Sequence, residues 1–576
     1  MGRQEGAARL KGKPAGSRIK KPFHKPITRV SNFHSLIRFL SVAFLSAAAA
    51  HATPLPAFPG AEGFAAHSTG GRGGDVYQVT NLHPNGPGSF LEGISTIPPQ
   101  GRTIVFTVSG FIPLNKTRIA APKLTIAGQT APGDGIALTG SSLTISAPDV
   151  VIRHLRFRHG AKGNGGDCIN PDGNARNLII DHCDVMFSAD ENLSSFRTAP
   201  PTMTFQWSTN AWGIYGHSCG GLWLIDHATA HHTLWANNKT RNPKVIFPKL
   251  LDWTNNVTFG WDIGMNLAGA DKPGTYKVNL RGNSFIQGSR GRNAIFGGGI
   301  LPDGTMPYHV YLDDCAMDGN GAAAPDVTAE GYALIDKDLY HKSPKPFPQT
   351  LAADPAKPND PILGLPVTID DRLTAYKKVI SQVGPLRLDL TSTIPLRDEV
   401  TTLLVNEVVQ QKRRKLTHES ETGLSNHGLG TLNPAPAPPD ADHDGMPDLW
   451  EKTLGSDPAK ADPNSPVSAA SFFPKNSPSG YTRLEEYLHF LAIPHAIIAA
   501  STPVTIDLRK LTSGFTKNPI FKTTHLTGGT IKSSGPGDSL VTFTPAPGHT
   551  GRATFDFTVT DDDNSTWTQS CALLVH

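Results

Sequence analysis

The chain has 576 residues, which is too long for one ordinary hydrophobic core, and its 38% hydrophobic and 18% charged residues are typical of a globular protein. A net charge of +4 is small for this length and argues against a nucleic-acid partner. The 57 glycines and 48 prolines favour many turns over long helices.

The five cysteines form no CxxC pair, which excludes a cysteine-rich zinc site and a disulfide-rich scaffold. Cys168 and Cys183 could pair in an oxidising compartment, or all five could be buried free thiols.

The N-terminus has the pattern of a secretory signal peptide over residues 1–52. Residues 1–30 are rich in Lys and Arg, and the apolar stretch LIRFLSVAFLSAAAAHA ends in the small-residue signal Ala50-His51-Ala52. The stretch is short for a membrane span. We therefore expect a secreted protein, extracellular or periplasmic; the alternative is an amphipathic targeting helix.

Short apolar runs recur along residues 53–320. They are VVIRHLRF (150–157), LIIDHCDV (178–185), MTFQWS (203–208), LWLIDHATA (222–230), LLDWTNNVTF (250–259) and YKVNLRGNSF (276–285). Successive runs begin roughly 20–28 residues apart, a period typical of solenoids. Their Val, Ile and Leu content favours strands, which stacking would bury in a parallel β-helix. A β-sandwich is the competing interpretation, but its turns should recur more often.

Polar pairs lie at the middle of several runs. Arg153-His154, Asp181-His182 and Asp226-His227 occupy similar places. We interpret them as a structural ladder of hydrogen-bonding side chains.

The C-terminal third changes character. Residues 370–384 and 396–410 have helical apolar spacing and belong to a predicted extension, 321–430, that packs on the core. A proline-rich linker, 428–439, leads into a predicted calcium module within 431–498, where 480–491 reads as an amphipathic helix. Residues 499–576 alternate cleanly (Ala553, Phe555, Phe557 and Val559 on one face), which predicts a small β-sandwich resembling immunoglobulin-like or cadherin-like modules.

The segment DADHDGMPDLWE, 440–451, has the spacing of a calcium-binding loop. Gly445 stands at position six, and the acids at positions one, three, five, nine and twelve are Asp440, Asp442, Asp444, Asp448 and Glu451. We predict a structural calcium site here; the alternative is an acidic linker.

Several segments, in order, resemble the pectate lyase family, the right-handed parallel β-helix lyases of polygalacturonan. They include FPGAEGFAAHSTGGRGGDVYQVTNL, LTIAGQTAPGDGIAL, VVIRHLRFRHG, GDCI, NLIIDHCDVMFSADENLS and NNKTRNPKV. The resemblance covers roughly residues 57–260 and continues more weakly to about 410. It implies an all-β fold and an enzyme that removes the C5 proton of a galacturonate and expels the oxygen at C4. A hard cation on the carboxylate would stabilise the developing charge, and Ca²⁺ suits that task.

The resemblance also implies site residues. Calcium ligands fall on Asp167 and on Asp190 or Glu191, and the base of the family's R-x-P-x-x-R motif falls on Arg241. The candidate substrate-binding residues are Lys239, Lys244 and His217. His231 and His232 are alternative bases.

The chain departs from the family pattern in three places. Ser194 stands where the family often has a further Asp, Ile246 replaces the second arginine, and Ser218 follows His217 where a lysine is usual.

The sequence is also compatible with other function classes. One is a glycoside hydrolase with paired carboxylates, and another is a pectin lyase acting on methylated substrate without calcium. A third is a non-catalytic pectin-binding protein. The tryptophans at 207, 212, 223, 235, 253 and 261 could stack on sugar rings or fill wide coils. We expect pectin, polygalacturonate or a related acidic polysaccharide as the partner, no membrane partner, and a monomer.

Overall fold

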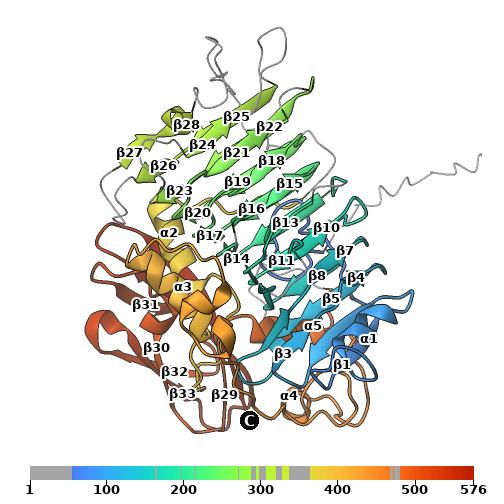
Figure 1. Cartoon of the computed structure of the whole chain (residues 1–576). Coiled ribbons are helices and arrows are strands. Elements are labelled where there is room, and N and C mark those ends of the chain that lie inside the picture. The colour runs from blue at the N-terminus through green and yellow to red at the C-terminus, as the bar shows by residue number, and fades with distance from the viewer. Residues whose placement is uncertain are drawn as a thin grey trace, which may run out of the picture. The chain divides into compact units, whose positions relative to one another are not determined.

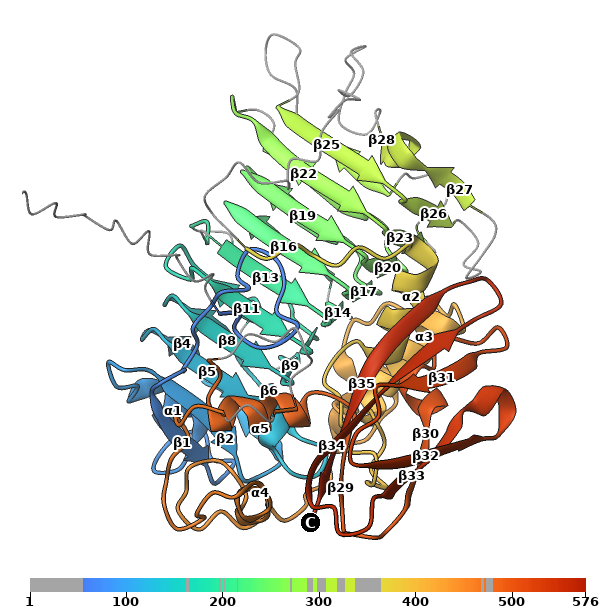
Figure 2. The ribbon, with the colours of Figure 1, turned by 180° about the vertical axis from the view of Figure 1, so that it is seen from behind.

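Four mostly parallel sheets form the three walls of a solenoid, which is the main body of the chain (Figures 1 and 2). The computed structural model describes residues 55–161, 165–195, 198–200, 202–214, 216–269, 272–286, 288, 294–297, 307–318, 327–336, 364–467, 471–472 and 480–576. The chain divides into two compact units, 1–53 and 54–576, and the predicted signal peptide lies outside the described residues.

Each coil contributes one strand to the first sheet. In spatial order its strands are β1 (Asp75–Val79), β2 (Arg102–Phe106), β5 (Leu124–Ala127), β8 (Val150–Arg153), β11 (Leu178–Asp181), β13 (Thr202–Gln206), β16 (His227–His231), β19 (Leu250–Thr254), β22 (Tyr276–Arg281) and β25 (Tyr308–Asp313). All of these neighbours pair in parallel, as consecutive coils of a solenoid must.

The second sheet runs beside the first. Its strands are β3 (Gly110–Pro113), β6 (Ile136–Thr139), β9 (Arg156–Arg158), β12 (Asp184–Met186), β14 (Thr209–Ala211), β17 (Leu234–Ala236), β20 (Val257–Phe259), β23 (Ser284–Ile286), β26 (Ala316–Asp318) and the antiparallel β27 (Val327–Glu330). The helix α1 (Phe90–Ser95) lies between β1 and β2 in the chain.

The third wall is made of two shorter sheets. One contains β4 (Thr117–Ile119), β7 (Leu143–Ile145) and β10 (Ile169–Pro171), and the other contains β15 (Leu222–Leu224), β18 (Lys244–Ile246), β21 (Met265–Ala268), β24 (Ile295–Gly297) and β28 (Ile335–Asp336). Single parallel bridges from Ile169 to Leu193 and from Ser195 to Trp223 continue the ladder across the gap between them.

The solenoid interior is apolar because each short strand turns its Val, Ile, Leu or aromatic side chains inward. One continuous buried cluster contains residues from every coil, including Ile126, Ile152, Ile180 and Leu251. The parallel solenoid predicted from the repeats is thus confirmed, and the β-sandwich interpretation of residues 150–285 is wrong.

The corner between the first and second sheets repeats an unusual backbone conformation. The residue after the sheet-one strand is left-handed in successive coils, with φ of 54° at His154, 48° at His182, 49° at Trp207 and 52° at His232. Their rings stack, with centroids 4.9 Å apart for His154 and His182 and 4.4 Å apart for Trp207 and His232. Left-handed backbone is costly for non-glycine residues, so the stacked rings and ladder hydrogen bonds must hold it.

The predicted side-chain ladder is confirmed in part. Arg153 and Asp181 are adjacent in register, and their side chains form a buried ion pair of 2.7 Å. The third predicted rung is wrong, because β16 begins at His227 and ends at His231. His231, not His227, pairs with Gln206 on the next coil, and Asp226 binds Lys249 at 2.9 Å.

Two helices cover the second sheet. They are α2 (Arg372–Gln382) and α3 (Glu399–Val409), and their apolar side chains share a buried cluster with Met186, Trp212 and Phe259 of the solenoid. Both helical segments were predicted from apolar spacing. Asp398 caps α3 by accepting from the amides of Val400 and Thr401 at 2.9 and 3.2 Å.

Asp398 also joins α3 to the solenoid through buried charges. Its carboxylate binds Arg158 at 2.6 Å and also contacts Arg156. Burial alone would raise the pKa of Asp398, but Arg158 and Arg156 outweigh it and hold the pKa well below its usual range. A carboxylate with a lowered pKa stabilises the fold above its unfolded-state pKa, and that contribution is lost as pH falls through the folded-state pKa.

We expect Asp398→Ala to lower the free energy of unfolding by about 3–5 kcal/mol, because it leaves buried arginines without their partner and removes a helix cap. Denaturant unfolding near pH 7 measures this effect. The matched control is Asp507→Ala, which removes a cap and an arginine pair at an exposed position and should cost about 1 kcal/mol or less. Equal losses in the two variants would contradict the buried-pair account.

The C-terminal residues form two small sheets. One has the order β29 (His495–Ile498), β35 (Thr566–Val575), β34 (Gly551–Thr560), β31 (Ile520–Thr524), and the other has β30 (Val504–Asp507), β33 (Leu540–Pro545), β32 (Gly529–Ser534). The four residues predicted to face the core, Ala553, Phe555, Phe557 and Val559, are fully buried. The predicted β-sandwich is confirmed; its boundary at residue 499 stays a prediction.

Two further helices, α4 (Asp448–Leu454) and α5 (Arg483–Leu491), lie between the solenoid and the sandwich in the chain. The short 3-10 helices are Gly128–Thr130, Gly331–Leu334, Glu419–Thr422, Asn426–Gly428, Leu508–Leu511 and Pro536–Asp538. Within the described parts of the chain, no helix has both the length and the apolar content needed to cross a membrane.

Candidate functional site

An acidic cluster forms on the third wall because successive coils stack in register. Asp167 lies just before β10, while Asp190 and Glu191 follow β12 on the next coil. The amide of Glu191 donates to Asp167 Oδ1 at 3.0 Å. One carboxylate oxygen from each of the three acids lies within 4.8 Å of the others. The three acids predicted from sequence are therefore brought together.

Two basic side chains come from the coils that follow. Glu191 bridges to Cys219, and Cys219 bridges to Thr240, so residues 217–219 and 239–241 stack above the acids. The Arg241 guanidinium forms an ion pair with Glu191, and His217 Nδ1 lies 2.5 Å from Asp190 Oδ1. Arg241 is left-handed, with φ of 58°, as are the corner residues His154, His182, Trp207 and His232.

The electrostatics of the cluster follow from partial burial. Burial and the charge of Asp190 raise the pKa of Asp167 to about 7, although Ser194 and Arg241 act in the opposite direction. Burial lowers the pKa of Arg241, while Asp190 and Asp167 partly counteract that change.

The two predicted lysines lie close by on the same wall. Lys244 begins β18, and burial together with the charge of Arg241 lowers its pKa. The amide of Lys239 donates to the carbonyl of Ser218 at 2.9 Å, one coil away. Cations therefore occupy the coils immediately above the acids.

A groove that sequence reasoning missed runs along the lower coils beside Asp167. It encloses about 570 Å³, and its lining includes Lys116, Arg118, Asn170 and Ser194. Arg118 and Asn170 occupy the same register line of the sheet, both opposite Thr144. Lys116 and Arg118 lie about 50 residues before Asp167 in the chain, so only the coil register reveals their proximity.

Segment 413–415 of the C-terminal extension was also missed. Lys415 and Arg413 both pair with Asp262, and the Arg413 guanidinium donates to the carbonyl of Trp261 at 3.1 Å. Asp262 lies on the coil after Lys239, to whose carbonyl it donates its amide. No spacing in the sequence connects these residues.

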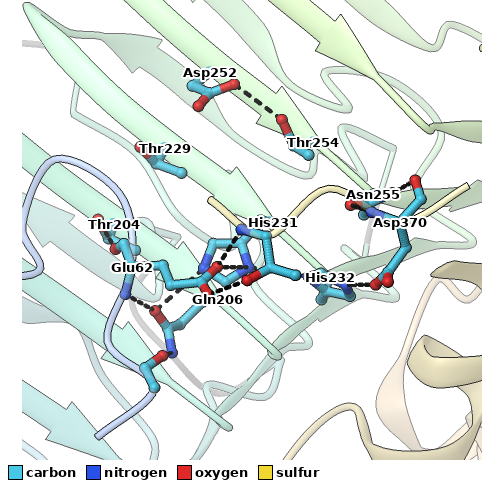
Figure 3. A network of polar contacts seen from close by, with 12 residues as sticks. Glu62, Thr204, Gln206, Thr229, His231, His232, Asp252, Thr254, Asn255 and Asp370 are labelled. Atoms are coloured by element: carbon cyan, nitrogen blue, oxygen red, sulfur yellow. Dashed lines mark hydrogen bonds and ion pairs between the residues drawn. The ribbon is translucent and has the colours of Figure 1, made fainter. Parts of the chain in front are cut away.

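The alternative bases His231 and His232 lie in a buried network at the corner of the first sheet (Figure 3). His231 Nε2 lies 3.2 Å from Gln206 Oε1, the two Nδ1 atoms are 3.0 Å apart, and His232 Nε2 lies 2.8 Å from Asp370. Each histidine is at most 2% exposed, so neither is accessible to a polymeric substrate.

Four tryptophans, Trp223, Trp235, Trp253 and Trp261, belong to the core of the solenoid, whereas Trp212 packs under α2 and α3. Trp212, Trp223, Trp235, Trp253 and Trp261 have no exposed surface and cannot stack on a sugar. Trp207 is half-buried and stacks on His232. All five cysteines are buried and free, so Cys168 and Cys183 are not paired.

The donor set of the acidic cluster fits a hard divalent cation. It consists of carboxylate oxygens alone, which Ca²⁺ prefers, and includes neither the imidazole nor the thiolate that softer metals favour. Ser194 adds a hydroxyl that interacts with Asp167, in the place where the family often has a further carboxylate.

The predicted loop at 440–451 forms a second acidic group. One oxygen each from Asp440, Asp442 and Asp444 cluster within 4.8 Å, and Asp444 also clusters with Glu451 and Asp462. Asp448 belongs to neither group; its carboxylate accepts from the amide of Ala441 at 2.9 Å and lies 3.8 Å from Lys452.

The fold and the site together define the class of protein. It is a parallel β-solenoid with acidic and basic side chains clustered on one outer wall. The sequence is 33% identical over 431 residues to the probable pectate lyase C of Aspergillus flavus, covering 74% of this chain and 93% of that protein. The probable pectate lyase C of Neosartorya fischeri is 32% identical over 449 residues, 76% of this chain and 94% of that protein. The chain belongs to the pectate lyase family.

Two solved structures align with part of the chain at low TM-score and low sequence identity. A variant of the Bacillus subtilis pectate lyase aligns with a TM-score of 0.36 and 15% identity over 56% of this chain and 96% of that one. Pectate lyase C from Erwinia chrysanthemi, at pH 9.5 with 30 mM Ca²⁺, aligns with a TM-score of 0.32 and 13% identity over 56% of this chain and 95% of its own. No family model matches the sequence.

Proposed function

We propose that the protein is a secreted lyase that cleaves polygalacturonate, or a closely related acidic polysaccharide, by β-elimination. The observation that carries the proposal is the contact of Arg241 with Glu191 inside the cluster of Asp167, Asp190 and Glu191. Family membership supplies the reaction class, and the cluster supplies the groups that the reaction needs.

Asp167, Asp190 and Glu191 would hold the Ca²⁺. When bound there, the cation would neutralise a uronate carboxylate and acidify its neighbouring C5 proton. His217 would hold the Asp190 carboxylate in place through their 2.5 Å contact, and it is exposed enough to meet a sugar hydroxyl as well. A hydrolase would need two carboxyl groups that flank the scissile bond, whereas in the proposed reaction the acids hold a cation.

Arg241 would accept the C5 proton. An ordinary arginine stays protonated, because its pKa exceeds about 12. Burial moves the pKa of Arg241 downward, which is the direction that a base requires. The adjacent cation Lys244 also disfavours a second positive charge at this place.

Lys239 and Lys244 would bind uronate carboxylates on the upper coils. The groove with Lys116 and Arg118 continues the cationic surface along the lower coils. A polymer of regularly spaced carboxylates matches cations placed one coil apart, because strand spacing repeats along the wall.

An assay with polygalacturonate tests the proposal. We expect an ultraviolet-absorbing unsaturated product that appears with Ca²⁺ and is absent in excess chelator. Highly methylated pectin should be the poorer substrate, because methylation removes the charge that the cation and lysines recognise. Cleavage that continues in chelator, or that prefers methylated pectin, would favour a pectin lyase. Binding without cleavage would identify a non-catalytic pectin-binding protein.

A further inference from the structure

The segment 440–462 carries buried carboxylate oxygens that the candidate lyase site does not use. Glu451 has no exposed surface, and neither of its carboxylate oxygens has a hydrogen-bond partner among the described residues. One oxygen each of Asp440, Asp442 and Asp462 is likewise buried and unpartnered there. Burying a charged carboxylate without a partner is strongly unfavourable, so such oxygens need a cation or a proton.

The other oxygens of these acids organise the loop. Asp440 Oδ2 accepts from the amide of Gly445 at 2.9 Å, and Asp444 accepts from the amides of Met446 and Asp462, each at 3.0 Å. Each carboxylate is thereby fixed by the backbone. Asp444 belongs to both acidic groups, so the two groups adjoin, and we call the place where they meet the centre of the cluster.

We propose a calcium site at this centre that fastens residues 440–491 to the first coils of the solenoid. Its ligands are Asp440, Asp442, Asp444, Glu451 and Asp462. Asp462 therefore replaces Asp448, which the loop spacing had predicted as a ligand. Five carboxylates in a flexible shell suit Ca²⁺ better than Mg²⁺, which demands strict octahedral geometry and retains several waters.

The site is joined directly to the solenoid. Gln78 of β1 donates to Asp440 at 2.6 Å, and Asn464 donates to the carbonyl of Gly74 at 2.8 Å. Gly445 has a positive φ of 90°, and a Cβ there would lie 3.1 Å from a methyl group of Val76. The turn that carries the ligands therefore packs tightly on the first strand.

The apolar contacts extend the attachment. Met446, Trp450 and Leu484 share a buried cluster with Ala127 of the solenoid and Leu574 of the sandwich. Arg483 of α5 pairs with Asp462, so the proposed ligand is tied to α5 as well. Bound Ca²⁺ would thus stabilise the junction of solenoid, helix and sandwich, because ligand binding to the folded state adds to its stability.

Calcium titration and thermal unfolding of the full-length protein test this proposal. All variants carry Asp167→Asn, which weakens calcium binding at the candidate lyase site, and the contribution of residues 440–462 is measured as the difference between this parent and each further variant. In the parent protein with Asp167→Asn alone, we expect calorimetry to detect the binding of one Ca²⁺. We also expect Ca²⁺ to raise Tm by a few °C or more, and Mg²⁺ to have little effect on either measurement. We expect Glu451→Gln and Asp462→Asn each to weaken binding more than about tenfold and to lose most of the rise.

Asp448→Asn is the matched control. The side-chain oxygen of the asparagine can still accept the hydrogen bond from the Ala441 backbone amide, so this variant should keep the calcium response. In chelator, Glu451→Gln should melt no lower than the parent, since it removes a buried charge, and this shows that the variant folds. Limited proteolysis in chelator should cut the parent within 440–491.

Three results would contradict the proposed calcium site. They are a parent that binds no Ca²⁺ at millimolar concentration, an undiminished calcium response in Glu451→Gln, or a response lost in Asp448→Asn and kept in Asp462→Asn.

Discussion

Asp167→Asn is expected to lower kcat/KM on polygalacturonate by at least about 100-fold, because it removes a charged ligand from the proposed cation at the reacting carboxylate. The side-chain oxygen of the asparagine can still accept the hydrogen bond that the Glu191 backbone amide donates, so the coil should remain folded. Initial rates across a calcium titration measure the effect, and added Ca²⁺ should restore only part of the lost activity.

The matched control is Asp172→Asn. Asp172 lines the same groove but belongs to none of the acidic groups found among the described residues. It should change kcat/KM by less than about threefold, as expected for an exposed ion pair. An Asp167→Asn protein with full activity would remove this carboxylate from the mechanism.

Arg241→Lys is expected to lower kcat by about 1,000-fold while leaving KM nearly unchanged, because lysine keeps the charge but not the position or proton affinity of the guanidinium. A loss confined to kcat indicates a group that acts in the transition state. Steady-state kinetics with polygalacturonate separate the two parameters.

Arg118→Lys is the control for the arginine. Its side chain is 58% exposed and lies in the same groove, so the substitution should alter KM slightly and kcat hardly at all. If Arg241→Lys instead raised KM and kept kcat, Arg241 would be a carboxylate clamp, and another group would have to accept the proton.

The solenoid could be predicted from sequence because its cause is local. Each coil needs a short inward-facing apolar run, and runs such as 178–185 and 250–259 recur at the period of one coil. Register was harder to predict. The pair Asp226-His227 resembles Asp181-His182 in composition, yet the strand continues four residues further and places His231 on the ladder.

The core of the candidate site was predictable through the family motifs, whereas its surroundings were not. Asp167, Glu191 and Arg241 lie in recognisable segments, but Lys116 and Lys415 reach the same wall from distant parts of the chain. Asp462 was missed for the same reason, since it lies eleven residues beyond the calcium-loop pattern that ends at Glu451. The tryptophans stayed ambiguous because composition cannot tell the inside of a coil from the outside.

Cleavage of polygalacturonate in ¹⁸O-labelled water, followed by mass spectrometry of the oligosaccharides, distinguishes β-elimination from hydrolysis. β-Elimination breaks the bond between C4 and oxygen by removing a proton, so no water enters the products. We predict unsaturated fragments that contain no ¹⁸O from the cleavage and that are lighter by one water than hydrolysis products. Saturated fragments carrying one ¹⁸O per cleavage would show hydrolysis and would contradict the account.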